Sequence, residues 1–271
     1  MAWMKVGTTT LSAPTPTYET DFSSSTGWVT SDSTYINVNT TTEKIDWDLK
    51  NDNTDDHITY NLGTALSDTL WVFRCTFRFS TASGTAQFFA GMSSTGGAQN
   101  TTQDFIGTCI LTGDNQFRSV DSDGATIPVV GDNLASYSWA SNTDYFLEIK
   151  RTSATAYSCT VRTGSHAGST VATASGTCTS TTVGLQYILF ANRVDSNGGS
   201  PDLTIDDMKI YNGVTDTSGA SNNLDITGKT VRKFNQFLHH EIPTGGDANI
   251  MMTFNNDATQ KYARRTSHNG G

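Results

Sequence analysis

The sequence is poor in charged residues, in glutamate and in long apolar segments. Charged residues make up 16% of the chain, and glutamate occurs only at positions 19, 43, 148 and 241. The chain therefore lacks the long periodic segments of Ala, Leu, Glu and Lys that helices need. No apolar run approaches the roughly 20 residues that cross a bilayer, so we expect no membrane insertion.

An excess of positive charge is also missing. The formal net charge is −9, and few cations are left over to neutralise phosphates, so we expect no nucleic-acid partner. Residues 1–225 hold 11 Lys/Arg and 23 Asp/Glu, a balance of −12, whereas residues 226–271 hold 6 and 3, a balance of +3. This asymmetry indicates separate modules and favours head-to-tail attraction between copies. Chance variation in a short basic tail is the alternative.

Motifs for catalysis and for metal binding are absent as well. The five histidines, at positions 57, 166, 239, 240 and 268, do not fall into H-E-x-x-H or another ligand spacing. The four cysteines show no C-x2-C spacing, which argues against a zinc site. The sequence therefore predicts no catalytic residue and no enzyme.

The four cysteines allow two interpretations. Cys159 and Cys178 lie nearly symmetrically about the turn at 164–168, so a cross-strand pair is feasible, and Cys75 with Cys109 would be the other pair. The alternative is four free, buried thiols, as expected for a chain that folds in a reducing compartment. The first ten residues show no apolar core with a small-residue cleavage site, which favours folding in the cytoplasm.

What the sequence has in abundance is Thr, Ser, Asn and Gly, which suit many half-exposed strands joined by turns. Residues 70–79 alternate between large apolar and polar side chains, which predicts a strand with one buried face. Turn signals, Asp123-Gly124 among them, separate further predicted strands. These lie at 45–49, 58–62, 87–92, 105–111, 116–120, 145–151, 157–162, 170–174, 185–191 and 203–211. The pattern predicts an all-β, antiparallel sandwich or jelly roll.

Two segments carry a resemblance to a known fold family. Residues 201–214, PDLTIDDMKIYNGV, resemble the closing strand of a concanavalin-A-like (laminin-G-like) jelly roll, and residues 144–162 resemble its hairpin. The resemblance runs from about 18 to 213 and implies a jelly roll over 18–214. We expect an extended N-terminal arm at 1–17, a linker at 215–225, and an incomplete β module or assembly tail at 226–271, which is too short for its own core.

The resemblance implies several functions, because this fold occurs in viral (phage-type) structural proteins, carbohydrate-binding modules and enzymes. Residues 253–265 are similar to modules of viral structural proteins. Our first hypothesis is a non-enzymatic virion structural protein of the tail-fibre or capsid-decoration type. It would be assembled in the host cytoplasm, released by lysis, bound to further copies or other virion proteins, and able to contact surface glycans. The alternative is an extracellular, calcium-stabilised carbohydrate-binding module.

A polysaccharide lyase or glycoside hydrolase is the third hypothesis. Glycan-cleaving enzymes of this fold use E-x-D-x-x-E, which is absent here, and Asp46 with Asp48 is the nearest imitation. Exposed strand aspartates are the simpler interpretation of that pair. A lyase would use His166 or His57.

Two binding sites are predicted from single residues. Trp139, with small polar neighbours, is the candidate glycan contact, and a packed core residue is the alternative. By resemblance, calcium would join the first and last strands through Asp21 and either Asp206 or Asp207, since carboxylate oxygens suit this ion. Alternatively, the Asp206-Asp207 pair forms a bulge in, or ends, an edge strand.

Overall fold

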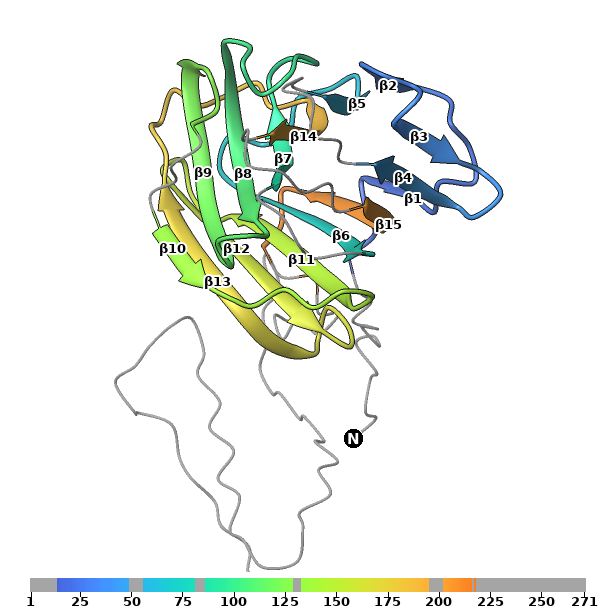
Figure 1. Cartoon of the computed structure of the whole chain (residues 1–271). Helices are drawn as coiled ribbons and strands as arrows, with labels where there is room; N and C mark the ends of the chain where they lie inside the picture. The colour runs from blue at the N-terminus through green and yellow to red at the C-terminus, as the bar shows by residue number, and fades with distance from the viewer. Residues whose placement is uncertain are drawn as a thin grey trace, which may run out of the picture. The chain divides into compact units, whose positions relative to one another are not determined.

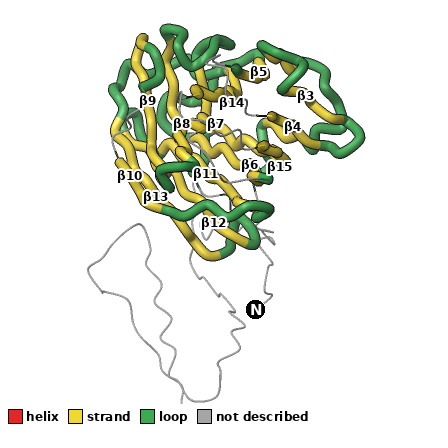
Figure 2. Tube along the Cα trace, in the orientation of Figure 1, coloured by secondary structure: helices red, strands yellow, loops and turns green. Residues whose placement is uncertain are grey.

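The computed structural model describes residues 14–48, 56–80, 86–128, 133–194, 202–215 and 217. The chain divides into two units, Met1–Leu224 and Asp225–Gly271. The predicted tail, most of the predicted linker and the first 13 residues of the predicted arm lie outside the described residues. Within the described part the chain forms strands and loops without helices (Figure 2), and no helix there is long and apolar enough to cross a membrane.

The strands of the described residues follow the predicted positions closely. They are β1 (Tyr18–Thr20), β2 (Trp28–Thr30), β3 (Ile36–Asn39), β4 (Lys44–Asp48), β5 (His57–Asn61), β6 (Trp71–Phe79), β7 (Ala86–Ser93), β8 (Gln103–Leu111), β9 (Gln116–Ala125), β10 (Asn133–Ser136), β11 (Asp144–Arg151), β12 (Ala156–Thr163), β13 (Ser169–Thr177), β14 (Tyr187–Val194) and β15 (Asp202–Asn212). The short strands β1, β2, β3 and β10 lie outside the predicted ranges.

Two antiparallel sheets form the sandwich (Figure 1). Sheet A has the order β13-β12-β11-β6-β15-β4-β3, and β1 also pairs with β15. Sheet B has the order β10-β9-β8-β7-β14-β5-β2. The predicted all-β jelly roll is confirmed.

The main core lies between the two sheets. On β6, the residues from Phe73 to Phe79 alternate between buried and partly exposed, as the sequence pattern predicted. Phe77 packs against Phe88 of β7 with ring centroids 6.2 Å apart, and Phe88 stacks on Phe190 of β14 at 6.1 Å. Each such buried ring removes apolar surface from water and contributes about 1.5–3 kcal/mol.

Sheet B also buries its other face. A second apolar cluster contains Phe89, Phe105, Cys109, Leu111, Val120, Ile127, Leu189 and Ala191. The loop at 94–102 meets this cluster at Gln99, whose backbone oxygen accepts a hydrogen bond from Ile127 N–H at 3.1 Å. Because both faces are covered, β7 and β14 contain consecutive buried residues, whereas β6 alternates.

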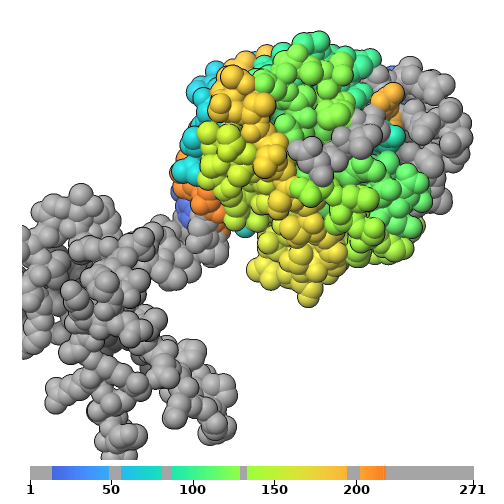
Figure 3. Space-filling model, turned by 90° about the vertical axis from the view of Figure 1, so that its left-hand side faces the viewer, coloured from blue at the N-terminus to red at the C-terminus, as the bar shows by residue number. Residues whose placement is uncertain are grey.

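One side of the sandwich is closed by the end of β9. Sheet B continues through Asp121–Gly124, so the turn predicted there is wrong. Asp123 Oδ2 accepts hydrogen bonds from the hydroxyls of Thr179 and Thr181 at 2.6 and 2.7 Å. These bonds join Asp123 to a segment that is distant in sequence. They hold residues 121–124 in strand β9, although the local sequence pattern of these residues favours a turn. Figure 3 views this side, with β9 in green and the β13 region in yellow to gold.

All four cysteines are free and buried. Cys75 lies in the core between the sheets, whereas Cys109 lies in the second cluster on the far face of sheet B. Cys159 faces Ala174 across the β12–β13 pair, and its Sγ is 3.2 Å from the Gly107 oxygen. Of the two interpretations, the disulfide pairs are therefore wrong and the four free, buried thiols are confirmed.

Candidate functional site

The structure corrects the glycan prediction for Trp139. Its side chain is only 5% exposed, and it packs among the rings of Tyr137 and Tyr145, with centroids 5.0 and 5.2 Å away. Phe77, Phe79 and Phe117 also lie against the indole ring. Because the ring is enclosed by other aromatics, it offers no face on which a sugar could stack. The packed-residue alternative holds.

The first and last strands meet as the resemblance implied. β1 pairs with β15, and Thr20 lies opposite Met208. Because the strands are antiparallel, this register places Asp21 next to the Asp206-Asp207 pair. Asp21 lies at the surface, where its Oδ1 accepts a hydrogen bond from Ser23 N–H at 3.0 Å. The Ser23 hydrogen bonds lower the pKa of Asp21. This aspartate therefore stabilises a local turn.

The other two predicted calcium ligands are engaged with lysines. Asp207 Oδ1 lies 2.8 Å from Lys209 Nζ, and Asp206 Oδ2 lies 3.6 Å from Lys44 Nζ. The register of β15 against β6 shifts between Asp206 and Lys209, so the predicted bulge is present, although β15 lies inside sheet A and not at its edge.

Calcium is not supported by this geometry. Among the described residues, no group of three or more Asp, Glu, His or Cys side chains could hold a metal ion. A calcium site needs six to eight oxygen ligands, and the predicted aspartates already have turn and lysine partners. The calcium site at Asp21, Asp206 and Asp207 therefore stays a prediction from resemblance.

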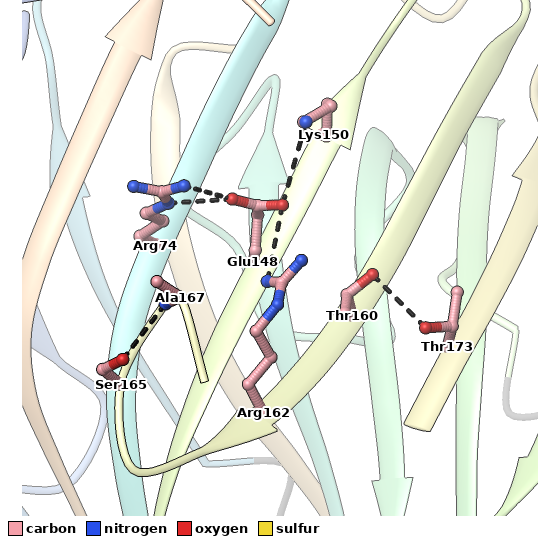
Figure 4. Close-up of polar contacts among 8 residues, drawn as sticks. All are labelled: Arg74, Glu148, Lys150, Thr160, Arg162, Ser165, Ala167 and Thr173. Carbon is pink, nitrogen blue, oxygen red and sulfur yellow. Dashed lines mark hydrogen bonds and ion pairs between the residues drawn. The ribbon is translucent and has the colours of Figure 1, made fainter. Parts of the chain in front are cut away.

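A cluster of charged and polar side chains lies on the outer face of sheet A. Backbone register places one residue from each of five neighbouring strands in a continuous row across this face, in the order Lys209, Arg74, Glu148, Thr160 and Thr173. The alternation that buries Phe73 and Cys75 on β6 turns Arg74 outward. Figure 4 shows Arg74, Glu148 and Thr160 on adjacent strands with Lys150 and Arg162 above and below them.

Glu148 is the centre of this face. Arg74 donates to Glu148 Oε2 from Nε at 2.9 Å and from Nη2 at 2.5 Å. Lys150 Nζ and Arg162 Nη1 lie 3.8 and 3.6 Å from the other carboxylate oxygen, Oε1. Side chains of both closely bonded partners are largely covered, with 16% of Arg74 and 8% of Glu148 exposed. Three cations thus surround one carboxylate.

The protonation state of Glu148 follows from two opposing effects. Burial raises its pKa, but the Arg74 hydrogen bonds and the charges of Arg74, Lys150 and Arg162 outweigh burial and hold the pKa below its ordinary value. Glu148 is therefore an ionised hydrogen-bond acceptor at neutral pH.

His166 lies beside this cluster in the β12–β13 hairpin. Its imidazole meets the Phe146 ring edge to face, with centroids 5.3 Å apart. Neither Nδ1 nor Nε2 has a hydrogen-bond partner, and both atoms are buried. Burial, followed by the charge of Arg74, lowers the pKa of His166 to about 4. The ring is neutral at pH 7, with one N–H donor and one acceptor nitrogen left unused.

These residues line a groove of about 510 Å³, which we call the Glu148 groove. Its lining consists of Arg74, Glu148, Lys150, Arg162, His166, Ala167 and Thr217. Arg162 Nη1 and the Thr217 hydroxyl are buried without a hydrogen bond. The groove therefore presents fixed donors and a net positive charge within a chain that is acidic as a whole.

Sequence reasoning found only part of this site. It singled out His166 as a candidate for the enzymatic hypothesis, and the alternation of residues 70–79 placed Arg74 on the exposed face. It did not bring Glu148 and Arg162 to Arg74, because the pairing of β6, β11 and β12 depends on long-range register. Asp46, one of the two aspartates that most nearly imitate a catalytic pair, accepts a hydrogen bond from Asn39 Nδ2 at 2.7 Å. It does not line the groove.

Comparisons with known proteins agree with the architecture. No protein-family model matches the chain, and no curated protein matches its sequence. Among solved structures, a GH43 protein from Bacillus licheniformis matches 72% of this chain and 39% of its own, with 10% identity and a TM-score of 0.50.

Two further structures give slightly lower scores. The CBM2 module of Lactobacillus casei BL23 phage J-1 evolved Dit matches 75% of this chain and 98% of its own, with 9% identity and a TM-score of 0.49. The Ca²⁺/Man-bound exoplasmic/lumenal domain of VIP36 matches 71% and 85%, with 11% identity and a TM-score of 0.49. Identities this low speak for the fold alone: the described residues form an antiparallel β-sandwich of the jelly-roll type.

Proposed function

We propose that the jelly roll is a non-enzymatic glycan-binding module and that the Glu148 groove is its binding surface. The observation that carries the proposal is the groove itself, which is lined by charged and polar side chains with buried, unused hydrogen-bonding atoms. Sugar hydroxyls both donate and accept hydrogen bonds, so they can satisfy the imidazole nitrogens of His166 and the guanidinium of Arg162. Small-molecule sites generally combine such a concavity with a few fixed polar groups.

In this proposal the module binds glycans without cleaving them. Glycoside hydrolases generally use two carboxyl groups, one of them protonated at the start of the reaction. Glu148 is the sole carboxylate among the described residues that line the groove, and its pKa is held low by its cations. His166, with its pKa lowered to about 4, would be a weak general base for a lyase.

A glycan array followed by calorimetry tests the proposal. We expect retention of at least one oligosaccharide class, weakened by Lys150→Ala and unchanged by Arg78→Ala. Arg78 is the matched control because it lies on β6 outside the groove lining and pairs with Asp144. Equal losses in both variants, or no retention at all, would contradict the groove as binding surface. Release of new reducing or unsaturated ends from a retained glycan would contradict the non-enzymatic part.

We further propose that the module belongs to a virion structural protein, of the tail-fibre or capsid-decoration type. Four free cysteines, buried in separate places, support folding in a reducing compartment such as the host cytoplasm. An extracellular carbohydrate-binding module is the alternative. Electron microscopy of the native source distinguishes them, since particle-bound copies are expected from the first and a free monomer from the second.

The calcium prediction is tested in the same array. We expect retained glycans to stay bound when a chelator is added, because the groove contains one carboxylate and no oxygen cage among its described residues. Loss of binding with chelator, restored by Ca²⁺, would instead support an ion held by Asp21, Asp206 or Asp207.

A further inference from the structure

The Glu148 groove holds more positive charge than its own carboxylate can pair. The hydrogen bonds of Glu148 go to Arg74, whereas Lys150 and Arg162 approach its other oxygen only at 3.8 and 3.6 Å. The cluster therefore keeps a net charge of about +2 at neutral pH. This surplus lies in a chain whose formal net charge is −9, so it runs against the overall composition.

Arg162 is the cation with the clearest unmet requirement. Its side chain is 21% exposed, and its Nη1 is buried without any hydrogen-bond acceptor. Leaving a buried charged donor without an acceptor is costly, and a bound acceptor with negative charge removes that cost most effectively. A planar guanidinium suits carboxylate and sulfate oxygens in particular.

His166 provides a second, independent indication. Its two ring nitrogens are buried and have no hydrogen-bond partner, although the charges of Arg74, Asp207, Glu148 and Arg162 act on the ring. An acceptor placed between Arg162 and the imidazole would receive a hydrogen bond from each. A neutral sugar hydroxyl could satisfy the imidazole, but it would leave the surplus charge uncompensated.

We propose that the groove recognises glycans through an anionic substituent, a carboxylate or a sulfate, bound by Arg162 and Lys150 with His166 N–H as a further donor. In this arrangement Glu148 holds the Arg74 guanidinium in place through two hydrogen bonds. This inference rests on the proposed glycan-binding function and specifies the chemical class of its ligand.

Three oligosaccharides that share one backbone test the inference: a neutral form, a form oxidised to the uronate, and a sulfated form. By calorimetry we expect one or both charged forms to bind at least about tenfold more tightly than the neutral form, which is the effect of one charge-assisted hydrogen bond. Higher salt should reduce that advantage. The ratio between the uronate and sulfated forms identifies the substituent.

Variants locate the effect within the groove. Arg162→Gln and, separately, Lys150→Gln should weaken binding of the charged forms much more than binding of the neutral form and so remove most of the tenfold advantage, whereas Arg78→Gln should retain it. Lys150 is the second variant because its side chain is 29% exposed, so its replacement is compatible with folding. Thermal unfolding checks that each variant is folded. Equal binding of all three oligosaccharides, or an advantage that survives both groove variants, would overturn the inference and leave glycan binding intact.

Inorganic sulfate separates this inference from the proposed function. Its binding should shift the NMR resonances of His166 and raise the pKa of that imidazole above about 4, because an anion favours the charged ring. A sulfate-dependent shift that is lost in Arg162→Gln supports the anion site even if none of the three oligosaccharides binds. Absence of both the shift and oligosaccharide binding would overturn the anion site and the glycan function together.

Discussion

The outer faces of the two sheets differ although both sheets are antiparallel. The outer face of sheet B carries an apolar cluster that includes Phe89, Phe105 and Leu189 at 0% exposure. The outer face of sheet A carries the Glu148 groove and a row of polar side chains. When both faces of a sheet are buried, its side chains pack against other parts of the protein and are not available to bind a ligand. The half-exposed sheet is where side chains remain available to a ligand.

The largest expected effect on stability comes from replacing adjacent residues on β7 of sheet B and on β6 of sheet A. On β7, Phe88 and Phe89 point to opposite faces and are both fully buried, whereas on β6 Phe77 is buried and Thr76 is partly exposed. We expect Phe88→Ala, Phe89→Ala and Phe77→Ala each to lower the free energy of unfolding by about 3–5 kcal/mol. Thr76→Ala should change it by less than about 0.5 kcal/mol.

Chemical denaturation measures these four variants through the transition midpoint, provided that the slope stays constant. A small effect of Phe89→Ala would show that the second cluster of sheet B is a loose cover and not a core. The contrast between the two sheets would then be wrong.

A buried arginine gives the second prediction. Arg151 is 0% exposed and donates to the backbone oxygens of Thr182, Ala154 and Ser153 at 2.9, 2.8 and 3.2 Å. We expect Arg151→Met to lower the free energy of unfolding by about 2–3 kcal/mol, because buried carbonyls lose their donor. The exposed Arg78→Met is the control and should change little. A neutral outcome for Arg151→Met would mean that these carbonyls find water.

Sequence reasoning predicted most of the fold because the strands of sheet A record their burial in local alternation. The alternation of residues 70–79 predicted both the strand β6 and which of its side chains are buried. The strands β1, β2, β3 and β10 were missed because three or four residues are too few to establish a periodic pattern. The Asp121–Gly124 turn was wrong because the bonds from Thr179 and Thr181 to Asp123 are made between distant segments.

The candidate site was harder to predict for the same reason. Arg74, Glu148 and Arg162 are far apart in sequence, and only the register of β6, β11 and β12 makes them neighbours. Trp139 was proposed as a glycan contact from its small polar neighbours in sequence, yet its spatial neighbours are aromatic rings. Local composition describes the chain next to a residue, not the layer that packs over it.

The third prediction concerns pH and the exposed face of sheet A. The pKa of His166 is lowered to about 4 in the fold by burial and Arg74, with Asp207 and Glu148 opposing and Arg162 adding to the decrease. The unfolded chain binds a proton near pH 6.5, where the folded chain does not. Stability should therefore fall as the pH decreases from about 6.5 towards about 4, by at most about 1.4 kcal/mol per pH unit.

Denaturation midpoints at about pH 7, 6 and 5 measure this dependence. His166→Gln should flatten the profile, since glutamine does not titrate. The comparison ends at about pH 5 because the pKa of Glu148 is also lowered, and that carboxylate loses its contribution only at more acidic pH. A profile that His166→Gln leaves unchanged would indicate that the imidazole has the same pKa in the folded and in the unfolded protein.

The smallest expected effect comes from two ion pairs that share one strand pair. Arg74 faces Glu148 and Arg78 faces Asp144 across β6 and β11. Both arginines donate two hydrogen bonds, but the side chains of Arg78 and Asp144 are 41% and 51% exposed, against 16% and 8% for the inner pair. Double-mutant cycles to alanine should give about 0.2–1 kcal/mol for the exposed pair, because water screens it. The inner pair should give a larger coupling that depends less on salt, since buried charges are screened less. Equal couplings would mean that solvent reaches Glu148 as freely as Asp144, and the groove would then lack the partly desolvated charge on which anion recognition depends.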